Sequence, residues 1–186
     1  MSTAVLPTPR LLTAEDYLHL PDTGGRRELR RGVVVTMNPP GFRHGEVCSN
    51  IHYHVDTFVR QQQIGRTLTN DSGIITERDP DTVRGADISY YSYSRVPKGQ
   101  SPVGYAGASP EIVFEVLSPY NTRTEILRKT GEYLSVDLKV VCVVDAQYGV
   151  ADLYYRDRPP ASLKGDDQLT FAELPGFSLP VRKLFE

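Results

Sequence analysis

Two acidic residues, Asp87 and Glu115, lie within apolar segments that are predicted to be strands. Burying a carboxylate in an apolar strand costs free energy unless a hydrogen bond or an opposite charge compensates it. Two carboxylates about 4 Å apart would also repel each other by roughly 4 kcal/mol at an effective dielectric constant of 20. A divalent cation would relieve that repulsion, and Mg²⁺ prefers oxygen ligands of this kind. The pair therefore indicates a metal site that could polarise a phosphodiester and activate a bound water.

The same two acids also have a simpler explanation. Each carboxylate could cap the end of its strand or pair with an arginine, and Arg84 is close enough to Asp87 in the sequence to do so. Two acids far apart in the sequence need not meet in space. Spacing alone therefore slightly favours this structural explanation over a metal site.

A lysine on the helix predicted to follow Glu115 could complete the chemistry. Lys129 lies three residues after Ile126 and four before Tyr133, so it borders the buried face of that helix. Its ammonium group could stabilise an attacking hydroxide or the charge that develops on the phosphate. The alternative is an exposed lysine that pairs with Glu125 or Glu132.

Glu28 is a third candidate acid, and arginines occupy positions 26, 27, 30 and 31 around it. In an extended strand, Arg26, Glu28 and Arg30 share one face. That face could hold an outer metal ligand beside arginines that bind a substrate phosphate, or it could be a solvated surface that neutralises itself. Residues 26–31 are also the only dense basic cluster in the sequence that could contact a nucleic-acid backbone.

The histidines are weaker candidates. His44, near the start of the longest predicted helix, could meet a substrate phosphate, although a capping or surface role is the simpler interpretation. His44 and Cys48 are four residues apart and could form half of a zinc site. No second pair completes the tetrahedron, so the sequence does not favour zinc.

The elements that position these residues follow from turn signals and hydrophobic periodicity. Thr13 is predicted to cap a short first helix, and residues 26–37 are typical of a hairpin that turns near Gly32. The longest helix is predicted over residues 44–63, where apolar residues recur at helical spacing and Gly65 would terminate it.

A strand–helix–strand unit is the clearest part of the second half. Strands predicted over 111–117 and 139–144 flank a helix over 122–135, which indicates a parallel crossover. Further strands are predicted over 72–77, 86–93, 149–155 and 169–174, with a long loop over 96–110. The expected fold is a mixed sheet flanked by helices, of the α/β or α+β class, with an N-terminal helix and hairpin.

Composition limits the class of protein. The 186 residues suit a single domain over 1–186 with a sizeable core, with residues 1–10 expected to be flexible. A net charge of −2 does not favour a strongly basic nucleic-acid binder, although a local basic patch remains compatible with it. Two distant cysteines are typical of reduced thiols, and no segment approaches about 18 consecutive apolar residues. We therefore expect a cytoplasmic protein without a membrane span or signal peptide.

The ordered set of motifs resembles the Uma-two-like restriction endonuclease family, within the PD-(D/E)xK nuclease superfamily. The similarity spans roughly Leu11 to Phe185. It rests on Glu28-Leu29-Arg30-Arg31-Gly32, a helix led by His44, Ala86-Asp87-Ile88-Ser89, Ile112-Val113-Phe114-Glu115-Val116-Leu117-Ser118-Pro119, Lys129-x-x-x-Tyr133 and Val143-Val144-Asp145. Each motif is weak alone, and the order is what makes the resemblance specific.

The resemblance implies a restriction-endonuclease-like core and a Mg²⁺-dependent endodeoxyribonuclease, with Mn²⁺ as a substitute ion and DNA as partner. It implies that Asp87 and Glu115 bind the metal, that Glu28 assists, and that Lys129 replaces the motif lysine. A homodimer would suit the cleavage of two strands, but no residue in the sequence fixes the oligomeric state.

The chain departs from the superfamily pattern at two positions. Leu117 stands two residues after Glu115, where the motif has a lysine, and a leucine cannot polarise water. Ala86 replaces a proline that only shapes the backbone. The alternative function is therefore a catalytically degenerate nucleic-acid or protein-binding module built on the same fold. A third is a structural subunit that assembles through Ile88, Tyr90 and the long loop.

Overall fold

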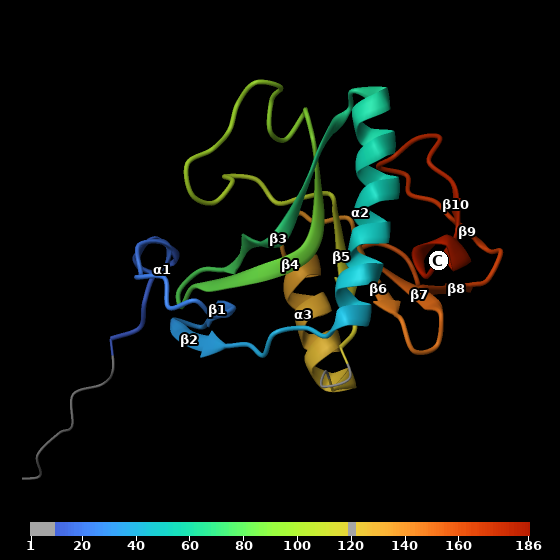
Figure 1. Ribbon diagram of the computed structural model, residues 1–186. Helices are drawn as coiled ribbons and strands as arrows, with labels where there is room; N and C mark the ends of the chain where they lie inside the picture. Colours follow the sequence, from blue (N-terminus) through green and yellow to red (C-terminus); the bar gives the residue numbers. More distant parts are fainter. Residues whose placement is uncertain (1–9, 119–121) are drawn as a thin grey trace, which may run out of the picture.

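The computed structural model describes residues 10–118 and 122–186 (Figure 1). The expected flexibility of residues 1–10 concerns mainly the segment 1–9, which lies outside the described residues, as does Pro119. The described elements are, in chain order, α1 (Ala14–Leu18), β1 (Arg27–Arg30), β2 (Val33–Thr36), α2 (Phe42–Gln62), β3 (Gly65–Glu77), β4 (Thr82–Ser92), β5 (Ile112–Val116), α3 (Arg123–Ser135), β6 (Val140–Asp145), β7 (Val150–Tyr155), β8 (Ala161–Lys164), β9 (Gln168–Leu169), β10 (Leu179–Pro180) and the 3₁₀ helix η1 (Val181–Leu184).

One large mixed sheet organises the molecule. Its strands follow the order β2-β1-β4-β5-β6-β7-β8, and β3 pairs with β4 outside this path. Strands β5 and β6 are parallel and α3 connects them, whereas the other paired strands of the sheet are antiparallel. The predicted strand–helix–strand unit and the predicted mixed sheet flanked by helices are both confirmed.

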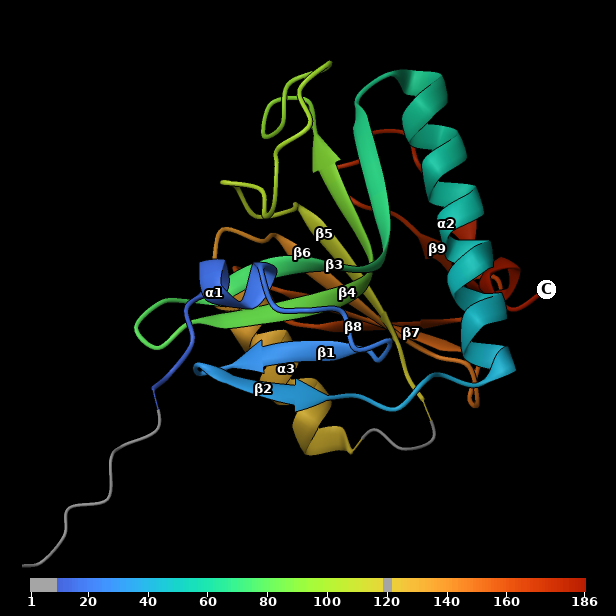
Figure 2. The same cartoon turned by 60° about the vertical axis from the view of Figure 1, so that its left-hand side comes forward.

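The two long helices cover opposite faces of the sheet (Figures 1 and 2). In β5, Ile112, Phe114 and Val116 pack in the same core cluster as α2, whereas Val113 packs with Tyr133 of α3. This alternation follows from the two-residue period of a strand. Glu115 shares the Val113 face, so the strand directs its carboxylate toward α3.

Local signals in the first half are largely confirmed. Thr13 caps α1 through a capping box with Asp16, and the β1–β2 hairpin turns through Arg31 and Gly32, both with positive φ. Helix α2, however, ends at Gln62, and the residue that caps it is Gln63, in the left-handed conformation, rather than Gly65.

Gly65 instead opens β3, where it packs closely against β4. A Cβ atom at this position would lie 2.3 Å from the carbonyl oxygen of Tyr91. The glycine at position 65 therefore permits a close approach of two strands. The prediction that Gly65 terminates the helix was wrong.

Strands β3 and β4 are longer than predicted, which places Asp87 in the middle of β4. Their register shifts between Thr69 and Ser72 of β3, where Asn70 and Asp71 have positive φ. This irregularity lies opposite Asp87, because Thr69 pairs with Ile88 and Ser72 with Ala86. Such bulges commonly redirect side chains beside functional sites.

Three other expectations can be compared with the structure. Residues 96–110, all of which are described, contain no helix or strand, as predicted. The strand predicted over 169–174 was wrong beyond Leu169, and β8 was missed. Ile88 and Tyr90 are buried in the core, so they are not available as an assembly surface. None of the described helices is both long and apolar enough to cross a membrane.

Candidate active site

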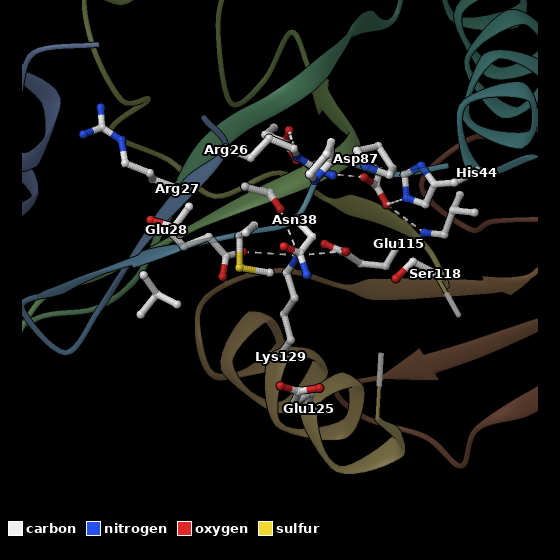
Figure 3. A pocket seen from close by; sticks show the side chains of 18 of the residues that line it. Arg26, Arg27, Glu28, Asn38, His44, Asp87, Glu115, Ser118, Glu125 and Lys129 are labelled. Carbon is white, nitrogen blue, oxygen red and sulfur yellow. Dashed lines mark hydrogen bonds and ion pairs between the residues drawn. The ribbon is translucent and has the colours of Figure 1, made fainter. Parts of the chain in front are cut away.

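The seven residues predicted to act at a site gather around one cavity of about 260 Å³ (Figure 3). They come from the hairpin, from α2, from the two central strands β4 and β5, and from α3. The seven are Arg26, Glu28, Arg30, His44, Asp87, Glu115 and Lys129. These residues are far apart in the sequence but close in space, because the sheet order places β1, β4 and β5 side by side.

Asp87 is fixed by contacts from three directions. Its Oδ2 accepts a hydrogen bond from the backbone N–H of Val116 at 2.8 Å and lies 3.3 Å from His44 Nε2. Its Oδ1 lies 3.4 Å from the Arg26 guanidinium. Asp87 thus pairs with an arginine, as the structural explanation allowed, but the arginine is Arg26, and Arg84 pairs with Glu28 instead. His44 is itself buried, so the surface role considered for it was wrong.

Glu115 projects from β5 toward α3 and meets two side chains of that helix. Its Oε2 lies 2.8 Å from Lys129 Nζ, and its Oε1 accepts a hydrogen bond of 2.8 Å from the Tyr133 hydroxyl. Tyr133 is fully buried. The sequence showed Tyr133 on the buried face of the helix and in the Lys129-x-x-x-Tyr133 motif, but assigned it no contact. Its hydroxyl is the signal that could have indicated a polar partner.

Lys129 reaches across the sheet from α3, on the same face as Glu115. Its Nζ donates to the carbonyl oxygen of Gly85 at 2.9 Å and lies 3.4 Å from Glu28 Oε1, in addition to its contact with Glu115. Glu125 instead accepts hydrogen bonds from Thr122 at the start of α3. The alternative of a lysine on the surface was therefore wrong.

Arg84 is the buried partner of two other acids. Its guanidinium lies 2.6 Å from Glu28 Oε2, and it also pairs with Glu132 of α3. Arg84 is 1% exposed and Glu28 is 4% exposed. This pairing fixes the Glu28 carboxylate between Arg84 and Lys129, so Glu28 is not part of a solvated hairpin surface.

We expect Arg84→Met to lower the free energy of unfolding by about 3–5 kcal/mol, because it leaves the buried carboxylate of Glu28 with one fewer cation. Arg128→Met is the matched control, since Arg128 pairs with the same Glu132 but its side chain is 45% exposed. The control substitution should lower the free energy of unfolding by at most about 1 kcal/mol. Urea denaturation would compare the two, and equal losses would show that Arg84 carries no special structural role.

Four charged groups lie at the centre of the cavity and shift one another's pKa in different directions: Glu28, Asp87, Glu115 and Lys129. Burial, with the nearby charge of Asp87, raises the pKa of Glu115 to about 7 despite the favourable contact with Lys129. Burial alone would also raise the pKa of Asp87, but the hydrogen bond and charge of His44 bring it below its ordinary value. Two carboxyls whose pKa values are driven apart are typical of sites that do acid–base or metal chemistry.

The other two charges are held firmly ionised. Burial would raise the pKa of Glu28, but Lys129 and Arg84 lower it to about 2. Burial would lower the pKa of Lys129, yet the charges of Glu115, Glu28 and Asp87 raise it. Glu28 and Lys129 therefore remain charged across the neutral range, and Glu115 is the group that can change protonation there.

The two arginines of the site are already engaged by acids. Arg26 forms a bidentate pair with Asp71, from the irregular part of β3, and also faces Asp87. Arg30 donates two hydrogen bonds to Glu28 Oε2. Asp71 was missed in the sequence because only the register shift in β3 turns it toward the cavity.

The donor set of the cavity fits a hard divalent cation. Asp87 and Glu115 supply carboxylate oxygens on adjacent strands, and their mutual repulsion contributes to the raised pKa of Glu115. Mg²⁺ is commonly bound by one or two carboxylates, with waters and substrate phosphates completing its shell.

Comparisons with known proteins agree with this architecture. A family model described as "Putative restriction endonuclease", Uma2, matches residues 14–182. The fold is similar to the crystal structure of a putative nuclease belonging to DUF820 from Anabaena variabilis ATCC 29413, with a TM-score of 0.81 and 19% sequence identity. The match covers 94% of this chain and 97% of that chain, and at this identity it shows the fold alone. The comparison with curated proteins found no match.

Proposed function

The chain belongs to the Uma2 family of putative restriction endonucleases, and from this premise we propose that it is a metal-dependent endodeoxyribonuclease. The observation that carries the proposal is the contact of 2.8 Å between Lys129 Nζ and Glu115 Oε2, in a cavity that Asp87 also lines. Leu117 cannot supply the motif lysine, but the ammonium group of α3 reaches the same acid from the next element. This arrangement supports a relocated lysine rather than a lost one.

Asp87 and Glu115 are the proposed ligands of Mg²⁺, with Mn²⁺ as a substitute ion. When bound, the metal would polarise the scissile phosphate and lower the pKa of a bound water. Asp87 is held for this role by the Val116 N–H and His44, which leave its Oδ1 on the side of Arg26. Tyr133 orients Glu115 through the hydrogen bond to Oε1.

Lys129 and Glu28 are proposed to work as a unit. The ammonium of Lys129 would hold an attacking hydroxide and offset the charge that develops on the phosphate oxygens. Glu28 keeps Lys129 charged and positioned, because its own carboxylate is fixed by Arg84. Arg26, Arg30 and His44 are proposed to contact the substrate phosphate, which would compete with the acids that now pair with them.

The experiment that tests the function is cleavage of supercoiled plasmid and short duplex DNA by the purified chain. We expect nicking or linearisation with Mg²⁺ or Mn²⁺, no cleavage with EDTA, and no cleavage by Glu115→Gln. Binding of DNA without cleavage by the wild-type chain would contradict the proposal and support the degenerate binding module that Leu117 suggests. The cytoplasm is the proposed location, and a homodimer the proposed state for cutting both strands.

Cleavage and Mn²⁺ binding are expected to rise about 10-fold between pH 6 and pH 8. Metal binding needs the Glu115 carboxylate, which is mostly protonated at pH 6 and mostly ionised at pH 8 if its pKa is about 7. The same raised pKa means that protonated Glu115 stabilises the fold below about pH 4.5, and that this contribution is lost as the pH rises through 7. Calorimetric titration of Mn²⁺ across this range is the measurement, and an affinity independent of pH would contradict the assignment.

A further inference from the structure

A histidine, a cysteine and a carboxylate meet on the α2 side of the candidate active site. His44 and Cys48 are one turn apart on α2, and Asp87 faces His44 from β4. His44 Nε2 lies 3.3 Å from Asp87 Oδ2, and His44 Nδ1 lies 3.5 Å from Cys48 Sγ. One ligand atom from each of the three residues lies within 4.8 Å of the other two.

This cluster has its own access route. A second cavity, of about 480 Å³, is lined by all three residues and by His52. Glu115 and Lys129 are not among its described lining residues, whereas His44 and Asp87 line both cavities. The cluster therefore forms part of the wall between the two cavities and can be reached without passing through the candidate active site.

The ligand chemistry of the cluster differs from that of the Asp87–Glu115 pair. A thiolate and an imidazole select borderline and soft ions such as Zn²⁺, whereas Mg²⁺ prefers oxygen ligands alone. Zinc binds sulfur at about 2.3 Å and nitrogen or oxygen at about 2.0–2.2 Å, so neighbouring ligands in a tetrahedral site are roughly 3.3–3.7 Å apart. The separation of 3.3 Å between His44 Nε2 and Asp87 Oδ2 lies in this range. Cys48 Sγ contacts the other ring nitrogen of His44, and since one nitrogen binds the ion, the relevant limit for the three ligand atoms together is the 4.8 Å given above.

We propose that His44, Cys48 and Asp87 form a binding site for a thiolate-preferring divalent cation such as Zn²⁺, with its fourth position open to the second cavity. Structural zinc sites have four protein ligands, whereas three protein ligands and one open position leave room for a water or another small ligand. Zinc that binds there would displace the Cys48 thiol proton to solvent. The sequence indicated His44 and Cys48 as half of a zinc site, and zinc was not favoured because no second pair was found. The third ligand, Asp87, comes from β4, and the spacing along the sequence could not assign it.

The site also has a consequence for the nuclease, which rests on the proposed function. Asp87 would be a ligand of both ions, so Zn²⁺ bound by Cys48 and His44 would take Asp87 away from Mg²⁺. Zinc is therefore expected to inhibit cleavage by the wild-type chain, and Cys48→Ser should be less sensitive to it.

The direct test uses Co²⁺ as a spectroscopic probe of the reduced, full-length chain and requires no cleavage activity. We expect a thiolate-to-cobalt charge-transfer absorption that saturates at one equivalent and is lost in Cys48→Ser. His44→Gln should weaken Co²⁺ binding by about 10-fold or more, the loss typical even of outer-shell partners. Cys142→Ala is the control for the other thiol, which is buried in the core. Glu115→Gln should keep the absorption while losing the proposed Mg²⁺ site.

The outcomes separate the two proposals. No charge-transfer absorption in the wild-type chain, its persistence in Cys48→Ser, or its loss in a folded Cys142→Ala would each overturn the soft-metal site. Circular dichroism would confirm folding of each variant, and Cys48→Ala would replace Cys48→Ser if the serine variant does not fold. A cobalt signal in a chain that never cleaves DNA would support this site and contradict only the nuclease.

Discussion

Replacing Lys129 with methionine is expected to reduce DNA cleavage by about 10³-fold while divalent-metal binding is retained. Lys129 Nζ contacts Glu115 and Glu28, so the substitution removes the positive charge beside a proposed metal ligand. A positioned donor that stabilises developing charge contributes about 10²- to 10³-fold, and general acid–base catalysis about 10²- to 10⁴-fold. Metal binding should persist because a cation that competes for the same carboxylates has been removed. Single-turnover cleavage and Mn²⁺ calorimetry would measure the two effects separately.

Lys139→Met is the matched control for this substitution. Lys139 lies ten residues further along the chain, and its half-exposed side chain pairs with the exposed carboxylate of Asp137. We expect the control to cleave DNA at the wild-type rate. Wild-type cleavage by Lys129→Met would refute the role of the lysine. A joint loss of cleavage, metal binding and thermal stability would instead show that Lys129 is a structural ion-pair partner.

The sequence was most informative where one short segment predicted both a helix or strand and which of its faces is buried. The apolar stripe of α2 predicted the helix that covers one face of the sheet, and the unit over 111–144 predicted β5, α3 and β6 in order. Within that unit, Glu115 and Lys129 are joined by a single connection. Their meeting follows because strand alternation and helix periodicity direct both side chains to the same layer.

Contacts that depend on strand pairing could not be predicted in the same way. Arg84 pairs with Glu28 because β1 and β4 are neighbours, with Leu29 opposite Val83. From the sequence, the nearby Asp87 was the partner considered for Arg84, because the sequence contains no signal for that register. The same holds for Asp71, whose position depends on the irregularity in β3 rather than on any motif.

The error in the C-terminal segment has a different cause. Leu169, Phe171 and Leu174 are all buried, which resembles the apolar pattern of a strand. Beyond Leu169, however, the backbone turns repeatedly, with hydrogen bonds from Leu174 N to Phe171 O and from Phe177 N to Leu174 O. The apolar side chains of this segment are buried by turns that pack on the α2 face of the sheet. The apolar pattern therefore predicted burial correctly but did not predict the backbone conformation.

Asp87→Asn is expected to have the broadest effect of any single substitution, since Asp87 lines both cavities. An amide supplies no negative charge, so Mn²⁺ affinity should fall at least about 100-fold and cleavage by about 10³-fold or more. Asp71→Asn is the matched control, because Asp71 lines the same two cavities and also pairs with Arg26 but is not a proposed ligand. It should keep Mn²⁺ affinity within about 10-fold of the wild-type chain.

The pattern across variants tests the shared role of Asp87 more strictly than any one loss. Glu115→Gln should lose the Mn²⁺ site and keep the cobalt–thiolate absorption, and Cys48→Ser should do the reverse. Asp87→Asn should lose Mn²⁺ binding and weaken Co²⁺ binding together, because its carboxylate lies between Arg26, His44 and the N–H of Val116 at the wall of both cavities. Calorimetry and absorption on the folded variants would measure both ions. If Asp87→Asn keeps the full Mn²⁺ affinity of the wild-type chain, Asp87 is not a ligand of the metal. That result would contradict the proposed mechanism.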